Sequence, residues 1–87
     1  MKNEEYRRMD LAPHNVILEN REHLSVSGVS EVISFDENQV SLVTSMGILT
    51  VGGQQLHVEK LNLEVGEIAI AGQIEAMVYE EDQLRRR

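Results

Sequence analysis

The segment QVSLVTSMGILTVGGQQLHV, residues 39–58, decides the fold class of this 87-residue chain. Apolar residues alternate with polar ones in three successive runs, which place Val40 with Leu42, Leu49 with Val51, and Leu56 with Val58. Side chains on a β-strand point alternately to opposite faces, so each run presents its apolar residues to one side of a sheet. Glycines between the runs are typical of turns and bends. The segment therefore predicts neighbouring antiparallel strands with one buried face.

The same alternation continues on both sides of this segment. It predicts strands near residues 15–20, 24–28, 31–36, 39–46, 48–52, 55–60, 61–65, 67–72 and 73–80, where neighbouring runs can form one long bent strand. Asp36, Glu37 and Asn38 suit a three-residue hairpin loop, and the Gly52-Gly53 pair and Gly72 are typical of turns. No convincing helix is available to cover a sheet face. The predicted fold is therefore all-β, a small antiparallel meander that forms a sandwich or a roll.

A weak internal repeat accompanies the strands. Residues 24–28, 49–53 and 68–72 each read aliphatic, small, Val or Ile, small, Gly. The spacings of 25 and 19 residues differ, whereas a solenoid repeats at a steady period. We interpret the repeat as similar strand ends within a meander, and a short β-solenoid is the alternative.

Charged segments flank the predicted domain, which covers residues 14–81. Residues 1–13 are polar and close with the only proline, Pro13. We expect them to form a mobile arm, with a short helix over residues 4–9 as the alternative. Residues 82–87 form a charged tail. The small core lacks disulfides or another covalent staple, so self-association is the first means of stabilisation to consider.

Composition excludes several classes of function. The formal charge of −7 repels phosphate backbones, so nucleic acid is not an expected partner. The absence of cysteine excludes disulfides, thiolate metal sites and cysteine nucleophiles, and three histidines cannot by themselves supply the four ligands of a tetrahedral zinc site. No segment resembles a signal peptide or a membrane span, so a cytoplasmic protein is expected. We expect no metal, cofactor or small-molecule substrate.

Two residues offer the only catalytic arrangement in the chain. His57 and Glu59 share a face on a predicted strand, and a histidine beside a carboxylate can act as a general base. No serine lies in the G-x-S-x-G frame that would supply a nucleophile. We therefore interpret the pair as a solvated strand face and expect no catalytic residues.

Two other positions are candidates for interaction with a partner. Phe35, the only phenylalanine, closes a predicted strand and is either a core residue or, if exposed, an interface anchor. Arg85, Arg86 and Arg87 end the chain and could bind an anionic surface or an acidic partner. A solubilising terminus is the alternative for the arginines.

Several segments together resemble the YabP family of sporulation proteins, sometimes grouped as YabP/YqfC. They read GVSEVISFDE at 28–37, VSLVTSMGILTVGG at 40–53, LHVEKLNL at 56–63, GEIAIAG at 66–72 and IEAMVY at 74–79. The similarity runs from about residue 14 to residue 81, and its matching positions are mostly glycine and aliphatic. Such positions describe a fold, and the family contributes no catalytic residues.

The resemblance implies a role in endospore formation. We expect a non-enzymatic structural or assembly protein that acts through protein–protein contacts, foremost as a homo-oligomer. An adaptor or scaffold for a membrane-bound sporulation protein is the alternative, and a small hydrolase that uses His57 and Glu59 is the weakest reading. The expected location is the cytoplasm of a spore-forming bacterium, with the surface of the developing spore as a further possibility.

Overall fold

The computed structural model describes residues 12–80, and their regular structure is entirely β. The strands are β1 (Val16–Glu19), β2 (His23–Ser27), β3 (Val29–Phe35), β4 (Gln39–Thr44), β5 (Gly47–Asn62) and β6 (Glu67–Glu80). The all-β prediction is confirmed. Residues 1–11 of the predicted arm, with the alternative helix over 4–9, and the predicted tail at 82–87 lie outside the described residues.

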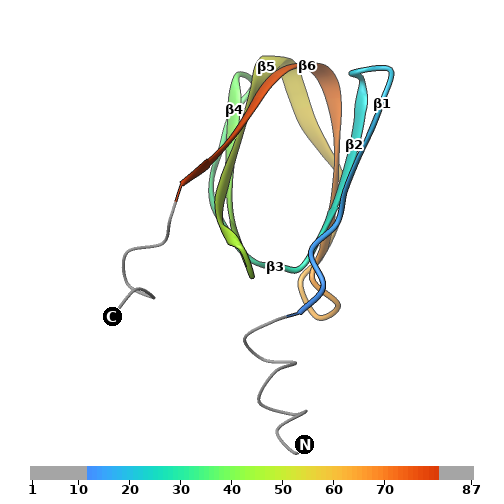
Figure 1. The fold of residues 1–87 in the computed structure, drawn as a ribbon. Helices are drawn as coiled ribbons and strands as arrows, with labels where there is room; N and C mark the ends of the chain where they lie inside the picture. The colour runs from blue at the N-terminus through green and yellow to red at the C-terminus, as the bar shows by residue number, and fades with distance from the viewer. Residues whose placement is uncertain (1–11, 81–87) are drawn as a thin grey trace, which may run out of the picture.

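All strands belong to one antiparallel sheet with the order β1-β2-β6-β5-β4-β3. Strands β3 to β6 form the predicted meander. The β1–β2 hairpin departs from it, because β2 pairs with the first half of β6 and not with β3. The chain therefore crosses from one side of the sheet to the other at Gly28, between β2 and β3 (Figure 1).

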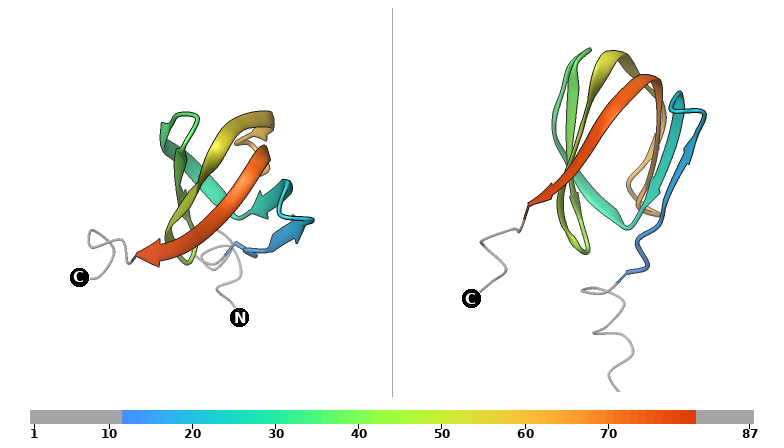
Figure 2. Two further views of the ribbon diagram at one scale, coloured as in Figure 1. Left: turned by 90° about the horizontal axis from the view of Figure 1, so that it is seen from above. Right: turned by 45° about the horizontal axis from the view of Figure 1, so that its top comes forward.

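The two longest strands, β5 and β6, bend together and roll the sheet (Figure 2). Several predicted short strands thus merge, and residues 63–66 form a turn. The Gly52-Gly53 pair lies within β5, so its predicted turn is wrong. The reason is close packing at the bend, since a Cβ atom on Gly53 would lie 1.9 Å from the carbonyl oxygen of Gln73. Gly72, predicted to mark a turn, lies within β6 and has a φ of +132°, a conformation that glycine tolerates best.

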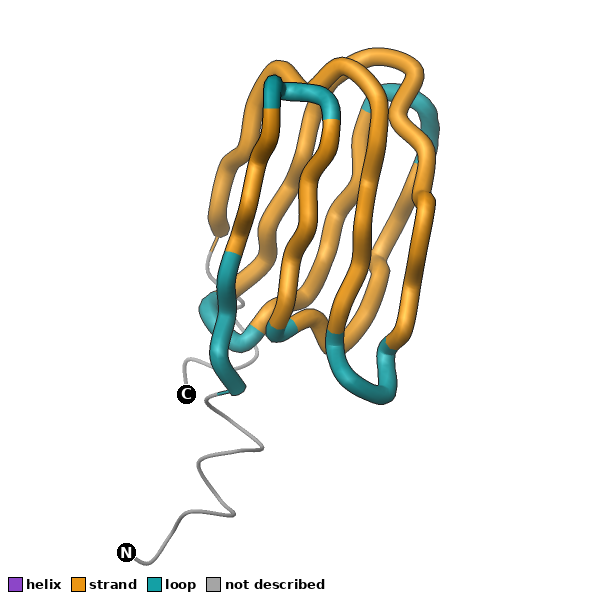
Figure 3. The backbone as a smooth tube through the Cα atoms, turned by 90° about the vertical axis from the view of Figure 1, so that its right-hand side faces the viewer, coloured by secondary structure: helices purple, strands orange, loops and turns teal. Residues whose placement is uncertain are grey.

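Hydrogen bonds between distant segments hold the roll at its two ends. At one end, called here the bend end, the Ile74 N–H donates to the Arg21 carbonyl (2.9 Å) and the Leu56 N–H to the Glu37 carbonyl (2.8 Å). At the other end, called the loop end, the Val29 N–H donates to the Gly66 carbonyl (3.0 Å). Figure 3 shows both sets of turns, which lie at opposite ends of the strands.

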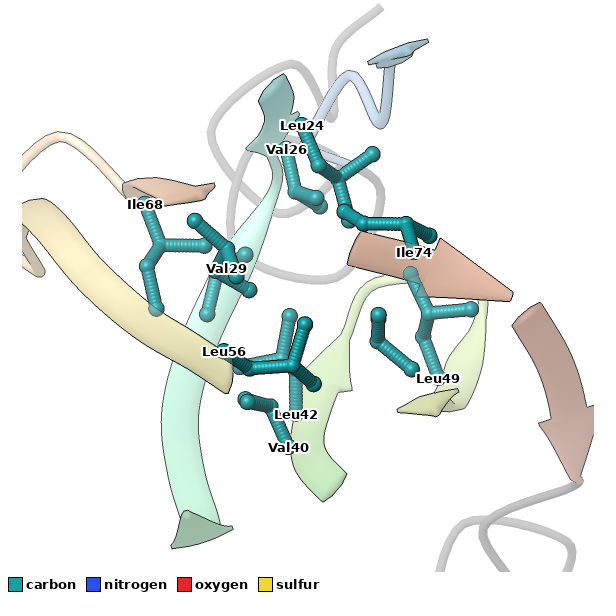
Figure 4. Close-up of a cluster of buried hydrophobic side chains, with 11 residues drawn as sticks. Leu24, Val26, Val29, Val40, Leu42, Leu49, Leu56, Ile68 and Ile74 are labelled. Atoms are coloured by element: carbon teal, nitrogen blue, oxygen red, sulfur yellow. The ribbon is translucent and has the colours of Figure 1, made fainter. Parts of the chain in front are cut away.

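The core fills the space enclosed by the rolled sheet (Figure 4). Its buried side chains are Leu24, Val26, Val29, Val40, Leu42, Leu49, Val51, Leu56, Ile68, Ile70 and Ile74. Each of the three repeat segments contributes its two aliphatic residues to this core and then reaches a glycine at a turn or bend. The segments are antiparallel strands of one sheet, so the repeat reflects similar strand ends and not a solenoid.

Candidate functional site

The two histidines of β2 and β5 lie on the outer face of the sheet. His23 and His57 are both register partners of Ala71, on opposite sides of β6. Glu59 does not pair with His57. Its Oε1 atom lies 3.7 Å from Nδ1 of His23, because the register of β5 shifts between Val58 and Lys60.

The surroundings of His57 provide little for catalysis. Its ring Nδ1 lies 3.3 Å from the carbonyl oxygen of Gln55, and the side chain is exposed. An open pocket of about 730 Å³ adjoins it, lined also by Arg21, Glu22 and His23, and the described residues that line this pocket include no serine, threonine or cysteine. Within residues 12–80, no group of three or more acidic or histidine side chains is placed to hold a metal ion. Within the described residues Glu59 forms its ion pair with His23 and not with His57, so the His57–Glu59 pair considered for a hydrolase is not formed.

Phe35, the candidate anchor of the sequence analysis, lies at the rim of the core. Its register partner Val40 is fully buried, so the phenyl ring is on the core-facing side of the sheet. It is nevertheless 46% exposed, because β3 is an edge strand. The other candidates, Arg85, Arg86 and Arg87, lie outside the described residues.

A larger apolar surface lies on the second half of β6. Met77, Val78 and Tyr79 are consecutive and are 37%, 54% and 49% exposed. Met77 and Tyr79 oppose the fully buried Val51 and Leu49, so they are on the core-facing side, whereas Val78 is on the outer side. We call residues 76–80 the β6 edge, since β5 covers only one side of this segment.

The backbone of the β6 edge also has free hydrogen-bonding groups. The Gly53 N–H donates to the Asn38 carbonyl, on the β4 side of β5. Backbone groups alternate in direction along a strand, so Gly52 and Thr50 face β6 and bond their partners Ala76 and Val78. The N–H and C=O groups of Met77 and Tyr79 then face away from β5, and residues 12–80 supply them with no backbone partner.

The other free strand edges of the described sheet are protected against pairing. β1 has four residues and ends at Glu19. β3 contains two register shifts and carries Glu31, and the second half of β5 contains a shift beside Lys60. Short length, bulges and charged side chains all hinder the addition of a further strand. Residues 76–80 pair with β5 without a shift, so the β6 edge is the regular one.

A contact with the segment that precedes β1 positions one member of this edge. The Tyr79 hydroxyl lies 2.7 Å from Nε2 of His14, and the two rings meet edge to face with centroids 5.7 Å apart. The His14 Nδ1 atom lies 2.8 Å from the Ser27 carbonyl oxygen. The aromatic ring of Tyr79 is thereby held near the loop end although half of it is exposed.

The β6 edge is not among the interaction surfaces predicted from the sequence. The available signal is the run Ala76-Met77-Val78-Tyr79, where four apolar residues replace the alternation of a strand with one buried face. Residues 12–80 contain no helix that could span a membrane.

Comparison with known proteins agrees with this fold signature. The model of the YabP family matches residues 10–86. The chain is similar to the spore protein YabP of Bacillus subtilis (strain 168), with 41% identity over 70 residues that cover 80% of this chain and 70% of the relative. The resemblance drawn from the glycine and aliphatic positions is confirmed, and the chain belongs to the YabP family.

Proposed function

We propose that this chain is a non-enzymatic structural or assembly protein of endospore formation, which acts through contacts with other protein chains. Membership of the YabP family and similarity to a protein named as a spore protein support the biological process. The observation that carries the assembly role is the β6 edge, where three consecutive apolar side chains are exposed beside free backbone groups. A regular, exposed and apolar strand edge is a template for a further strand.

The first partner we propose is a second copy of the chain. A rolled sheet of 69 described residues has a small core, and small domains gain stability when a partner covers exposed apolar surface. Assembly would occur in the cytoplasm of a spore-forming bacterium or at the surface of the developing spore.

The test is self-association inside sporulating cells. Two copies of the full chain, each with a different affinity tag, are expressed together in a sporulating Bacillus subtilis strain. Isolation through one tag should recover the other copy. Recovery of neither the second copy nor any other protein, with the tagged chain eluting as a monomer, would contradict the proposal. Recovery of a different protein in its place would favour the adaptor role.

A further inference from the structure

We propose that the β6 edges of two copies pair as antiparallel strands about a two-fold axis, with Val78 opposite the partner's Val78. This inference rests on the proposed function and specifies its contact surface. A two-fold contact uses the same surface on both subunits, so this surface must be complementary to itself. The backbone and the side chains of the β6 edge both meet this condition.

The backbone condition concerns Met77 and Tyr79, whose N–H and C=O groups face outward. With Val78 on the axis, Met77 lies opposite the partner's Tyr79, and Tyr79 lies opposite the partner's Met77. Residues that face each other with outward groups form the hydrogen-bonded pairs of an antiparallel ladder. The register therefore satisfies the outward N–H and C=O groups of both residues. Figure 1 shows that the end of β6 diverges from β1, which leaves the edge of β6 that faces away from β5 unpaired within the described sheet.

The side chains favour the same register. On the core-facing side, each Met77 would contact the partner's Tyr79, and the pairs would cover the open rim above Val51 and Leu49. On the outer side, the two Val78 side chains meet at the axis. Contacts between aromatic, β-branched and thioether side chains across strands are favourable.

The positions of the charged residues are compatible with this register in an acidic protein. Residues 12–80 contain ten carboxylate side chains but only two that are lysine or arginine, so copies approach each other against repulsion. Within residues 76–80 the register places Glu80 opposite the partner's Ala76, and no carboxylate opposes another. A shift of two residues that centres the pair on Met77 also opposes no two carboxylates, but it would place the acidic Glu75, in place of the apolar Met77, opposite the partner's Tyr79. We therefore favour the pairing centred on Val78.

A single cysteine tests the geometry directly, because the natural chain has none. Val78→Cys would place two thiols opposite each other at the axis, in a non-hydrogen-bonded pair. The Cα separation of such a pair, about 4.5 Å, lies within the range of a disulfide. The matched control is Val65→Cys, since Val65 is similarly exposed (61% against 54%) but lies in the β5–β6 turn.

The two variants of the full chain are oxidised at equal concentration and separated by non-reducing electrophoresis. We expect Val78→Cys to form the covalent dimer at least about tenfold faster than Val65→Cys, because pairing holds the thiols at a high effective concentration. A second pair of variants, Val78→Lys and Val65→Lys, is compared by sedimentation, with circular dichroism as the check on folding. Like charges would meet at the axis in the first only, which should weaken its self-association about tenfold.

The outcomes separate this inference from the proposed function. If the natural chain associates with itself but Val78→Cys cross-links no faster than Val65→Cys, another surface forms the contact. The inference is then overturned, while the assembly role stands. If the natural chain stays monomeric and neither cysteine variant cross-links, both the pairing and self-association are overturned.

Discussion

Replacement of Gly53 by alanine should strongly destabilise the domain, because the bend of the sheet depends on close contact at this residue. The added methyl carbon would lie 1.9 Å from the Gln73 carbonyl oxygen and 3.2 Å from the Ile74 Cα atom. A carbon and a carbonyl oxygen pack at about 3.3 Å or more, so the methyl group is roughly 1.4 Å too close. The obstacle is backbone, which cannot rotate away as a side chain can.

The expected loss in the free energy of unfolding is about 3 kcal/mol. Overpacking of a closely packed site costs about 1–3 kcal/mol. Movement of the bend would also strain the hydrogen bond from the Gly53 N–H to the Asn38 carbonyl, 3.0 Å long, and a backbone hydrogen bond contributes about 1 kcal/mol. In a domain of this size a loss of 3 kcal/mol lowers Tm by about 12–24 °C.

The adjacent glycine provides the control. A Cβ atom on Gly52 would meet nothing closer than 4.0 Å, and its φ is not in the left-handed region. Gly52→Ala should therefore stabilise the domain by up to about 1 kcal/mol, because alanine restricts the unfolded chain more than glycine does. Thermal and urea unfolding, followed by circular dichroism, measure both variants. Equal effects of the two substitutions, or a loss below about 1 kcal/mol for Gly53→Ala, would refute the close contact at the bend.

Four further substitutions separate the roles of the core, a turn, the β6 edge and the outer face. Ile70→Ala should lower the free energy of unfolding by about 2–5 kcal/mol, since Ile70 is fully buried. Leu63→Ala, at a 44% exposed turn residue, should change it by less than about 0.5 kcal/mol, and urea titration compares the two. Tyr79→Phe removes the hydrogen bond to His14 and should cost less than about 1 kcal/mol. It should leave sedimentation unchanged, and lost association would show that the hydroxyl takes part in the contact. His57→Ala should alter neither stability nor association, and a loss above about 1 kcal/mol would assign the imidazole a structural role.

Much of the fold follows from local patterns. The alternation around Leu49 and Val51 identified the core-facing side of β5, and both residues are fully buried. The hairpin at Asp36–Asn38 was also predictable, because a short carboxylate can bond the backbone of its own turn. The Oδ1 atom of Asp36 accepts hydrogen bonds from the N–H groups of Asn38 (2.7 Å) and Gln39 (2.9 Å).

The features that depend on distant contacts were not predictable from such patterns. Adjacent glycines resemble a turn locally, and only the approach of Gln73 shows why Gly53 lies within a bent strand. The exposure of the β6 edge likewise depends on strand order, since Met77 would be covered if β1 paired with β6. The sequence left open whether Phe35 is a core residue or an exposed one, and its position at the rim follows from β3 being an edge strand. The pairing of Glu59 with His23 in place of His57 depends on a register shift that the alternation does not reveal.

Sedimentation equilibrium of the purified full chain over a wide concentration series tests the assembly role most directly. We expect the apparent mass to rise from the 9.9 kDa of one chain toward twice that value as concentration increases. An apparent mass of one chain at every concentration, in a sample shown by circular dichroism to be folded, would contradict self-association.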